Sequence, residues 1–285
     1  MRLLVTGAGG QLGIDLVATC TAAGDDVLAF DRAGLDICAR DDVHGALSAL
    51  RPDVVVNCAA WTAVDACEGD PDRALAANGI AVRWLAEAAA RAGAHLVQVS
   101  TDYVFDGTLD RSYREGDDTN PQSVYGLSKL AGEREALVLG TAATVVRTSW
   151  VCGDHGSNMV KTIMRLAAQH PELAFVADQV GHPTFTQDLA PVLRRLALDR
   201  LSGVVHVTNQ GQCSWFEFAR EVVTAMGDDA AKVRAITTAE LQPPRPAPRP
   251  ANSVLDNAVL RSAGYPMLRD YREPLGETVR TLLDG

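Results

Sequence analysis

The sequence has no basic cluster, no apolar run of membrane length and no apparent leader. Lys and Arg number 26 against 36 Asp and Glu, which gives a net charge of −10. An acidic chain without a basic patch is a poor candidate for binding nucleic acid or an anionic membrane. No apolar run approaches the roughly 20 residues that span a bilayer, and Gly7 comes too early for the apolar core of a signal peptide. We therefore expect a cytoplasmic protein with neither nucleic acid nor a membrane as partner.

Paired cysteines and clustered metal ligands are also missing. The six cysteines and six histidines are scattered, with no C-x-x-C pair and no H-x-x-x-H spacing of the kind that holds zinc. Free, mostly buried thiols are expected, and no catalytic metal. Cys58 lies within the apolar run 54–60, where a place in the core is favoured over a nucleophilic role.

A glycine motif near the start indicates a nucleotide site. An apolar strand over 3–5 leads directly into Gly7-x-x-Gly10-x-x-Gly13, and a helix is predicted over 14–23. The spacing differs by one residue from the G-x-G-x-x-G dinucleotide fingerprint. Such glycines permit a tight turn and bring backbone N–H groups to a pyrophosphate at the positive end of the helix. Glycines also end ordinary strands, but the order of strand, turn and helix favours nucleotide binding.

An acidic residue follows the second predicted strand, 26–30. Asp31 is placed to accept hydrogen bonds from an adenosine ribose, as expected for NADH, whereas Arg32 beside it could hold the 2′-phosphate of NADPH. Both cofactors therefore stay open. A short third strand is predicted over 35–37, with Asp36 near the adenine end.

The first half of the chain alternates apolar strands with helices. The run 52–60 is continuously apolar, as in strands buried on both faces of a parallel sheet. Ala59 and Ala60 at its end are small enough to let a cofactor lie close. The pattern predicts an α/β fold with a Rossmann-type doubly wound parallel sheet. The other elements predicted in this half are helices over 41–50 and 78–92 and strands over 95–105 and 143–147.

The length of the chain, 285 residues, exceeds the usual size of one compact domain. Residues 1–150 are assigned to an NAD(P)-binding domain, to which later segments can return, and residues 151–285 to a smaller C-terminal α/β substrate-binding region. The Pro-rich run 243–250 fits a rigid surface arm and a ligand contact equally well. Helices in the second region are predicted over 159–169 and 189–198, and the remainder, including 215–226, is expected to form a smaller lid that completes the pocket.

The catalytic candidates lie between these regions. The strand 95–105 carries Ser100 and Thr101 near its end, where ligands of open sheets collect, so either hydroxyl could bond a substrate oxygen. Tyr125 and Lys129 are four residues apart and share a face if their segment is helical. An ammonium group close to a phenol stabilises the phenolate and lowers its pKa toward neutrality. A lone Y-x-x-x-K is nevertheless more often an ordinary surface pair.

In these motifs the chain resembles the extended short-chain dehydrogenases/reductases and, more specifically, the dTDP-4-dehydrorhamnose reductases. The superfamily cues are the glycine motif and Tyr125-x-x-x-Lys129, with a hydroxyl residue between them. The specific resemblance spans nearly the whole chain. Its blocks are GQLG at 10–13, NCAAWTAVD at 57–65, STDYVFDG at 100–107, YGLSKLAGE at 125–133, RTSWV at 147–151, DQxGxPT at 178–184 and RPxxS at 249–253.

The resemblance implies NAD(P)H-dependent reduction of the C4 ketone of dTDP-4-dehydro-L-rhamnose to dTDP-L-rhamnose. It implies that Tyr125 protonates the C4 oxygen as hydride reaches C4, that Lys129 holds the nicotinamide ribose and lowers the tyrosine pKa, and that Thr101 hydrogen-bonds the ketone. The cofactor site is assigned to Gly7, Gly10, Gln11, Leu12, Gly13, Asp31, Arg32, Asp36, Ile37, Ala59, Ala60, Trp61, Thr62, Tyr125 and Lys129. The dTDP-sugar site is assigned to Thr101, Asp102, Val104, Trp150, Asn158, Gln179 and Arg249.

Two positions depart from the family pattern. Some family members dimerise through Mg²⁺ bridged by surface carboxylates. Asp15 could serve here, but Gln187 stands where a second acid is expected, so Mg²⁺ and a homodimer are left open. Trp61 takes a place where a smaller aromatic residue or histidine is more usual.

Two other functions compete with the implied one. The first is reduction of another dTDP-4-keto-6-deoxysugar in secondary metabolism, because stereochemistry depends on how the second region orients the hexose. The second is a non-catalytic regulatory member of the same fold. The intact set of Thr101, Tyr125 and Lys129 weighs against this second alternative.

Overall fold

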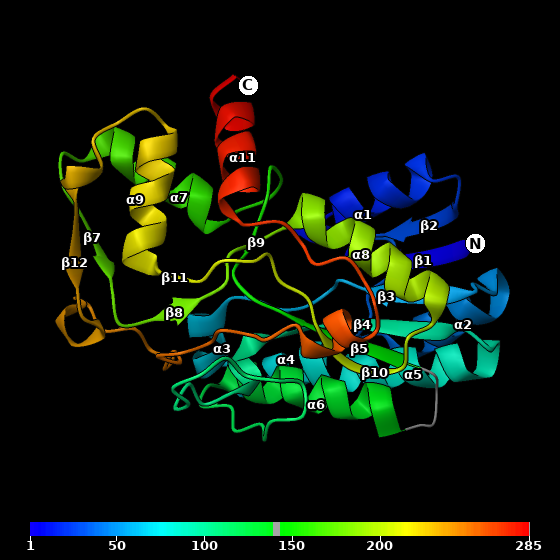
Figure 1. The fold of residues 1–285 in the computed structure, drawn as a ribbon. Coiled ribbons are helices and arrows are strands. Elements are labelled where there is room, and N and C mark those ends of the chain that lie inside the picture. Colours follow the sequence, from blue (N-terminus) through cyan, green and yellow to red (C-terminus); the bar gives the residue numbers. More distant parts are fainter. Residues whose placement is uncertain (139–142, 285) are drawn as a thin grey trace.

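A six-stranded parallel sheet dominates the computed structural model, which describes residues 1–138 and 143–284 (Figure 1). Its neighbouring strands all pair in parallel. In spatial order the strands are β10 (Gly203–His206), β5 (Ala143–Thr148), β4 (His95–Thr101), β3 (Val54–Asn57), β1 (Arg2–Thr6) and β2 (Asp26–Phe30). The chain proceeds from β1 to β2 on one side and to β3 on the other, so the strand order reverses at β1. The predicted Rossmann-type doubly wound sheet is confirmed, and its reversal point is where such sheets bind ligands.

Helices cover both faces of this sheet. The helices α1 (Gln11–Ala22) and α8 (Thr186–Asp199) lie on one face, and α2 (Arg40–Leu50), α5 (Ala81–Ala92) and α6 (Val124–Val138) lie on the other (Figure 1). In β1, Leu3 and Val5 pack with α1 and α8, whereas Leu4 packs with α2 and α5. Because side chains alternate along a strand, burial on both faces accounts for the continuous apolar strands.

A second lobe with its own hydrophobic core begins after residue 150. Its helix α9 (Trp215–Ala225) packs on the parallel pair β7 (Leu173–Val176) and β12 (Val233–Ile236), and α7 (Met159–Gln169) and α11 (Arg272–Asp284) pack against α9 (Figure 1). The same part of the chain also forms two short strand pairs. In these, β6 (Val151–Cys152) pairs with β9 (Thr184–Phe185), and β8 (Val180–Gly181) pairs with β11 (Cys213–Ser214). The remaining α-helices are α3 (Val64–Gly69), α4 (Pro71–Leu75) and α10 (Ala258–Ser262).

Two later elements return to the large sheet. The strand β10 pairs with β5, and α8 packs beside α1. Residue 150 therefore marks where the chain first leaves the sheet. The division into a cofactor domain and a substrate domain at that residue stays a prediction.

The predicted third strand over 35–37 is wrong. These residues form turns, in which the Leu35 N–H donates to the Asp31 carbonyl and the Cys38 N–H donates to the Asp36 carboxylate. Leu35 and Ile37 are buried in the same core as α2 and α5. Their apolar character therefore reflects packing over the sheet and not strand pairing.

The strand predicted over 95–105 is too long, because β4 ends at Thr101. The Thr101 side chain accepts a hydrogen bond from the Tyr103 N–H and begins a single 3₁₀ turn, η2 (Asp102–Val104). The helix predicted over 78–92 opens as a π-helical turn, η1 (Ala76–Ile80), before α5. The turn η2 therefore changes the direction of the chain at the sheet edge, directly after the polar residues that end β4.

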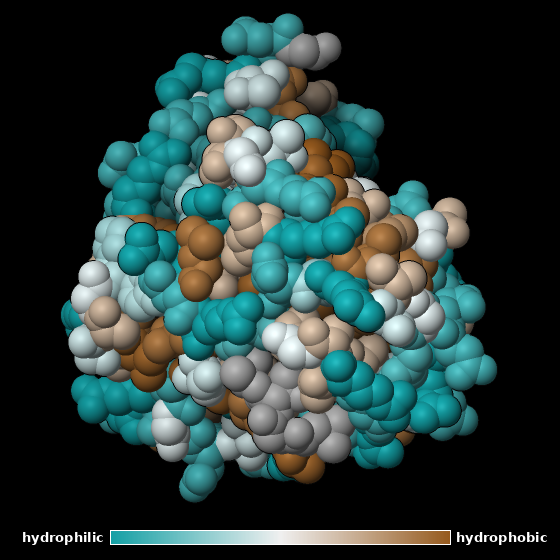
Figure 2. Space-filling view, turned by 90° about the vertical axis from the view of Figure 1, so that its right-hand side faces the viewer, coloured by the Kyte–Doolittle hydropathy of each residue, from teal (hydrophilic) through white to brown (hydrophobic). Residues whose placement is uncertain are grey.

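The surface is mostly hydrophilic on the side of α1, β2 and α2. There, hydrophobic side chains form small separate groups (Figure 2), as is ordinary for a protein surface. Within the described residues, no helix combines the length and the apolar character needed to cross a membrane.

Candidate active site

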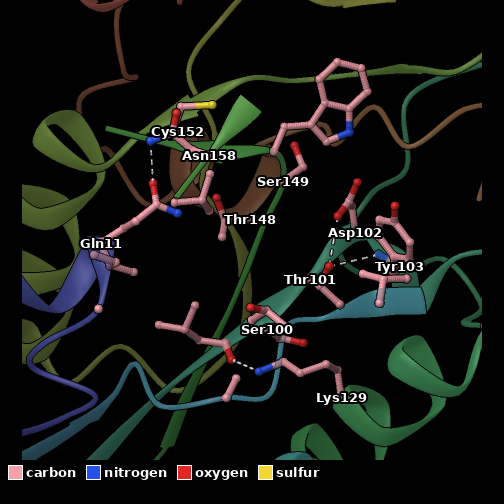
Figure 3. A pocket seen from close by; sticks show the side chains of 18 of the residues that line it. Gln11, Ser100, Thr101, Asp102, Tyr103, Lys129, Thr148, Ser149, Cys152 and Asn158 are labelled. Carbon is pink, nitrogen blue, oxygen red and sulfur yellow. Dashed lines mark hydrogen bonds between the residues drawn. The ribbon is translucent and has the colours of Figure 1, made fainter. Parts of the chain in front are cut away.

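A cavity of about 470 Å³ lies at the carboxyl end of the large sheet. It is bounded by the glycine turn, by the ends of β4 and β5, by α6 and by the start of the second lobe (Figure 3). Of the predicted site residues, it brings together Gly10, Gln11, Leu12, Gly13, Ala60, Thr62, Thr101, Asp102, Tyr125, Lys129, Trp150 and Asn158. We call it the first cavity.

The glycine turn is built so that only glycine fits at two positions. A Cβ on Gly13 would lie 2.2 Å from the Gly7 carbonyl oxygen, and one on Gly7, whose φ is +68°, would lie 2.6 Å from the Ala59 nitrogen. The residue before α1 is Gly10, which has no side chain to cap the first-turn N–H groups. An uncapped helix start beside a close-packed glycine turn is a cradle for a pyrophosphate. The residues present therefore fit a dinucleotide cofactor.

The adenosine end of this cradle is shaped by the residues after β2. Asp31 lies beside the turn, since a Cβ on Gly9 would be 3.6 Å from the Asp31 Cβ. Arg32 and Asp36 form an exposed ion pair with an N–O distance of 3.5 Å. The side chain of Ile37 is buried in the core, so only its backbone is available to a cofactor.

Thr101 and Asp102 form a buried pair at the end of β4. The Thr101 hydroxyl donates to Asp102 Oδ1 over 2.9 Å (Figure 3). Burial raises the pKa of Asp102 to about 6, against hydrogen bonds from Ser253 and Thr101. Val104, two residues on, is fully buried among Phe105 and its neighbours. Its side chain therefore faces a core cluster and not the first cavity, where it was predicted to contact substrate.

Ser100 and Thr101, which the sequence could not separate, have different surroundings. The Ser100 hydroxyl donates to Glu133 Oε1 over 2.5 Å, and Glu133 is itself paired with Arg147 at 2.7 and 2.9 Å. All three side chains are buried. Ser100 is thus committed to a buried ion pair, which favours Thr101 as the hydroxyl that meets a ligand.

Tyr125 and Lys129 project from α6 into the same cavity. Both are nearly buried, at 8% and 4% exposure. Lys129 Nζ donates to the Val99 carbonyl over 2.7 Å (Figure 3). Burial raises the pKa of Tyr125, although a hydrogen bond with Thr101 opposes this, and burial lowers the pKa of Lys129 to about 8, against the field of Glu133. The predicted lowering of the tyrosine pKa by Lys129 is therefore wrong, because burial raises this pKa and the Lys129 ammonium donates to a backbone carbonyl.

This burial predicts that Lys129→Met raises stability at neutral pH. Between about 8 in the folded protein and the ordinary 10.5, the unfolded chain binds this proton more tightly, so the free energy of unfolding rises with pH across that window. We expect Lys129→Met to remove the rise and to add roughly 3 kcal/mol at pH 7. Urea unfolding at pH 7 and pH 9.5 measures both effects.

A matched control is Lys161→Met, since Lys161 Nζ also donates to a backbone carbonyl, that of Asp154, at 2.7 Å. Lys161 is on α7 and is less buried. If the free energy of unfolding of Lys129→Met rises between pH 7 and pH 9.5 as much as that of the unaltered chain, the assignment of the buried ammonium would be contradicted.

The second lobe adds two side chains that the sequence assigned to substrate. Trp150 lies parallel to Trp215, with ring centroids 3.6 Å apart. Asn158 caps α7 by accepting from the Lys161 N–H, and its amide donates to Gln11 Oε1 over 3.0 Å (Figure 3). Asn158 therefore links the second lobe to the first turn of α1, on the cofactor side of the cavity.

A second cavity of about 350 Å³ adjoins the first and shares Tyr103, Met159 and Trp215 with it. Gln179 and Arg249 line it, together with Arg245. Through these shared residues, the lining extends from the glycine turn in the first cavity to a pair of arginines in the second.

The sequence missed several residues that line the first cavity. Tyr103 directly follows Thr101 and Asp102, so its place in the sequence could have predicted that it lines the cavity. No motif or spacing in the sequence could have predicted the same for Trp215. Cys58 packs against the core, as predicted, and also lines the cavity, with burial raising the pKa of its thiol to about 12. The others are Val64, Val99, Thr148, Ser149, Val151, Cys152 and Met159.

Some predicted residues lie apart from the cavity. The ring of Trp61 lies under the Arg73 guanidinium, 4.3 Å from its centroid. Asp15 pairs with His155 at 3.5 Å, and the Gln187 amide donates to Glu277. No cluster of three or more His, Cys, Asp or Glu residues suited to a metal ion occurs in the part of the chain that is described.

Comparison with known proteins places this site in a family. The family model described as the RmlD substrate binding domain matches residues 1–283. A dTDP-4-dehydrorhamnose reductase of Streptomyces griseus is 44% identical over 287 residues, covering 99% of this chain and 94% of that protein.

Two solved structures have nearly the same fold. A dTDP-4-dehydrorhamnose reductase from Clostridium acetobutylicum has a TM-score of 0.95 and 43% identity, covering 99% of this chain and all of the other. Another from Bacillus anthracis, solved in complex with NADP, has a TM-score of 0.94 and 37% identity, covering 100% and 99%. The chain therefore belongs to the dTDP-4-dehydrorhamnose reductase family.

Proposed function

We propose that the chain is an NAD(P)H-dependent oxidoreductase that reduces the C4 ketone of dTDP-4-dehydro-L-rhamnose to give dTDP-L-rhamnose. The observation that carries the proposal is the placement of Tyr125, which is buried and hydrogen-bonded with Thr101, in one cavity with the glycine turn. The relatives named dTDP-4-dehydrorhamnose reductase support the choice of substrate, and the NADP-bound relative supports the cofactor.

The reaction needs a proton donor and an oriented ketone. A bound nicotinamide supplies the hydride that reduces C4. A ketone oxygen between Thr101 and Tyr125 would accept a hydrogen bond from the Tyr125 hydroxyl and, once the single Thr101 proton turns away from Asp102 Oδ1, from Thr101 as well. Tyr125 would release its proton as negative charge develops on that oxygen. Lys129 would hold the cofactor ribose, because its ammonium lies on the same face of α6 and has further N–H donors beyond the one on Val99.

The nucleotide part of the substrate is assigned to the second cavity. Arg245 and Arg249 supply cationic donors for a diphosphate, and Gln179 supplies an amide whose nitrogen now donates to Thr238 Oγ1 over 2.9 Å. Trp150 and Asp102 line the first cavity and would contact the hexose. A cytoplasmic location, a homodimer and any use of Mg²⁺ stay predictions.

The direct test is the loss of NADPH absorbance, then of NADH absorbance, with dTDP-4-keto-L-rhamnose and the purified chain alone. Rapid loss with this sugar is the expected result. Turnover of only the unepimerised 4-keto sugar would indicate a different deoxysugar reductase. No turnover of either sugar despite tight nucleotide binding would indicate a non-catalytic member of the fold.

Cofactor preference is predicted to depend on Arg32. Its exposed guanidinium follows Asp31 at the adenosine end, where charge-assisted bonds to a 2′-phosphate add about 1.5–3 kcal/mol. We expect Arg32→Ala to weaken NADPH binding by about tenfold and to leave NADH binding unchanged, as measured by fluorescence titration. Arg134→Ala, an exposed arginine on α6, is the control. An equal loss of affinity for NADPH and NADH would show that Arg32 does not act by binding the 2′-phosphate.

A further inference from the structure

The Pro-rich run 243–250 is held against the cofactor side of the molecule by one carboxylate. Asp65, on α3, accepts the Ala247 N–H at 3.1 Å and pairs with Arg245 at 3.4 Å. Its two oxygens also accept hydrogen bonds from Arg249 Nη1 and Nη2, at 2.5 and 2.7 Å. The segment is therefore neither a free arm nor a flexible linker: it forms a wall of the second cavity, anchored at Asp65.

The Arg249 side chain is fixed in one orientation. It is 14% exposed, and Nη1 also donates to the Ala247 carbonyl at 2.7 Å. A guanidinium has five N–H donors, so Asp65 and Ala247 leave donors for the Tyr103 hydroxyl, which bonds Arg249, and for a ligand. Tyr103 in turn packs edge-on against Tyr125, with ring centroids 5.6 Å apart. Contacts thus run from Asp65 to the ring of the proposed general acid.

The charges at this wall do not cancel. Two guanidinium groups, of Arg245 and Arg249, meet the single carboxylate of Asp65. The pKa of Asp65 is lowered to about 2, chiefly by the hydrogen bond from Arg249, so the carboxylate is ionised at any working pH. The wall keeps an excess positive charge next to a cavity that could receive an anion.

We infer that Asp65 is a positioning residue for the phosphate groups of the substrate: it holds Arg249 in the orientation that a diphosphate meets in the second cavity. This inference rests on the proposed function, since it assumes a nucleoside diphosphate sugar. A planar guanidinium that is already oriented loses less side-chain entropy on binding a phosphate. Asp65 lies one residue after Val64, which lines the first cavity, so the same carboxylate ties the phosphate wall to the cofactor side.

The sign of one substitution separates positioning from simple charge balance. Asp65→Asn removes a negative charge near two arginines, so electrostatics alone predicts tighter binding of an anion. Loss of the ionic pair that orients Arg249 predicts weaker binding. We expect positioning to dominate, with the Kd of dTDP increased at least tenfold and the Kd of NADPH changed less than twofold, both measured by calorimetry.

Thymidine and a second acid supply the controls. Thymidine lacks phosphate, so Asp65→Asn should change its binding less than twofold. Glu172→Gln also removes a carboxylate from an ion pair, that with Arg234 at 2.8 Å. Glu172 precedes Leu173, which lines the second cavity. Because it does not hold Arg249, this variant should leave the Kd of dTDP within twofold.

Unchanged or tighter dTDP binding by Asp65→Asn would overturn the inference, as would an equal loss of thymidine binding. If that variant does not fold, Asp65→Glu is measured in the same way, and a dTDP-selective loss is again required. Failure of the unaltered chain to bind dTDP would contradict the proposed function itself, and this outcome is distinct from the others.

Discussion

Tyr125→Phe is expected to lower turnover by about a hundredfold or more, the usual scale for loss of a positioned acid. The substitution removes only the hydroxyl. The ring would keep its packing against Tyr103, and the glycine turn, which carries the proposed pyrophosphate contacts, is untouched. The affinity for NADPH should therefore change little. Steady-state rates with the keto sugar and a fluorescence titration of NADPH give the two quantities.

Tyr265→Phe is the matched control for this change. The Tyr265 hydroxyl donates to Asp199 on the surface, at 2.8 Å, far along the chain from the first cavity. Its turnover should equal that of the unaltered chain. Normal turnover in Tyr125→Phe would remove this tyrosine from the mechanism and make Asp102, with its pKa raised to about 6, the next acid to test in the cavity.

Arg147→Met is expected to lower the free energy of unfolding by about 3–5 kcal/mol, the usual cost of leaving one partner of a buried ion pair alone. The side chains of Arg147 and Glu133 are only 5% and 3% exposed. Without the guanidinium, the Glu133 carboxylate would lose its ion pair, and of the contacts described above only the hydrogen bond from the Ser100 hydroxyl would remain. Urea unfolding at pH 7 measures the loss.

Two further variants test the reason for that loss. Arg234→Met breaks an exposed ion pair and should cost less than about 1 kcal/mol. The double variant Arg147→Met with Glu133→Leu should recover part of the stability, because no unpaired charge is then buried. A loss in Arg147→Met no larger than in Arg234→Met would contradict the account of the buried pair.

Features encoded by neighbouring residues could be predicted from the sequence. The glycine turn needs glycine at positions 7 and 13, only six residues apart, and the shared face of Tyr125 and Lys129 follows from helical periodicity. The sheet followed from continuous apolar strands between helices. Each of these depends on residues within a few positions of one another, which is the range over which backbone geometry is fixed.

Features that depend on distant segments could not be predicted. The Asp65 carboxylate meets Arg249 across most of the chain, and nothing near Trp150 indicated that its ring would stack on Trp215. The choice between Ser100 and Thr101 required the position of Glu133, which takes the serine hydroxyl. The pKa of Tyr125 was predicted in the wrong direction because spacing places Lys129 nearby but does not reveal burial or the Val99 carbonyl that holds the ammonium.

The return of β10 and α8 to the large sheet has a consequence for how the molecule can be divided. A fragment that ends at residue 150 would expose the pairing edge of β5, a hazard for aggregation, and would uncover the apolar side of α1 that Leu189, Leu193 and Leu196 bury. We therefore expect that residues 1–150 could not be excised or grafted as an autonomous module. Engineering that exchanges substrate specificity between relatives has to keep these two returning segments with the recipient's sheet.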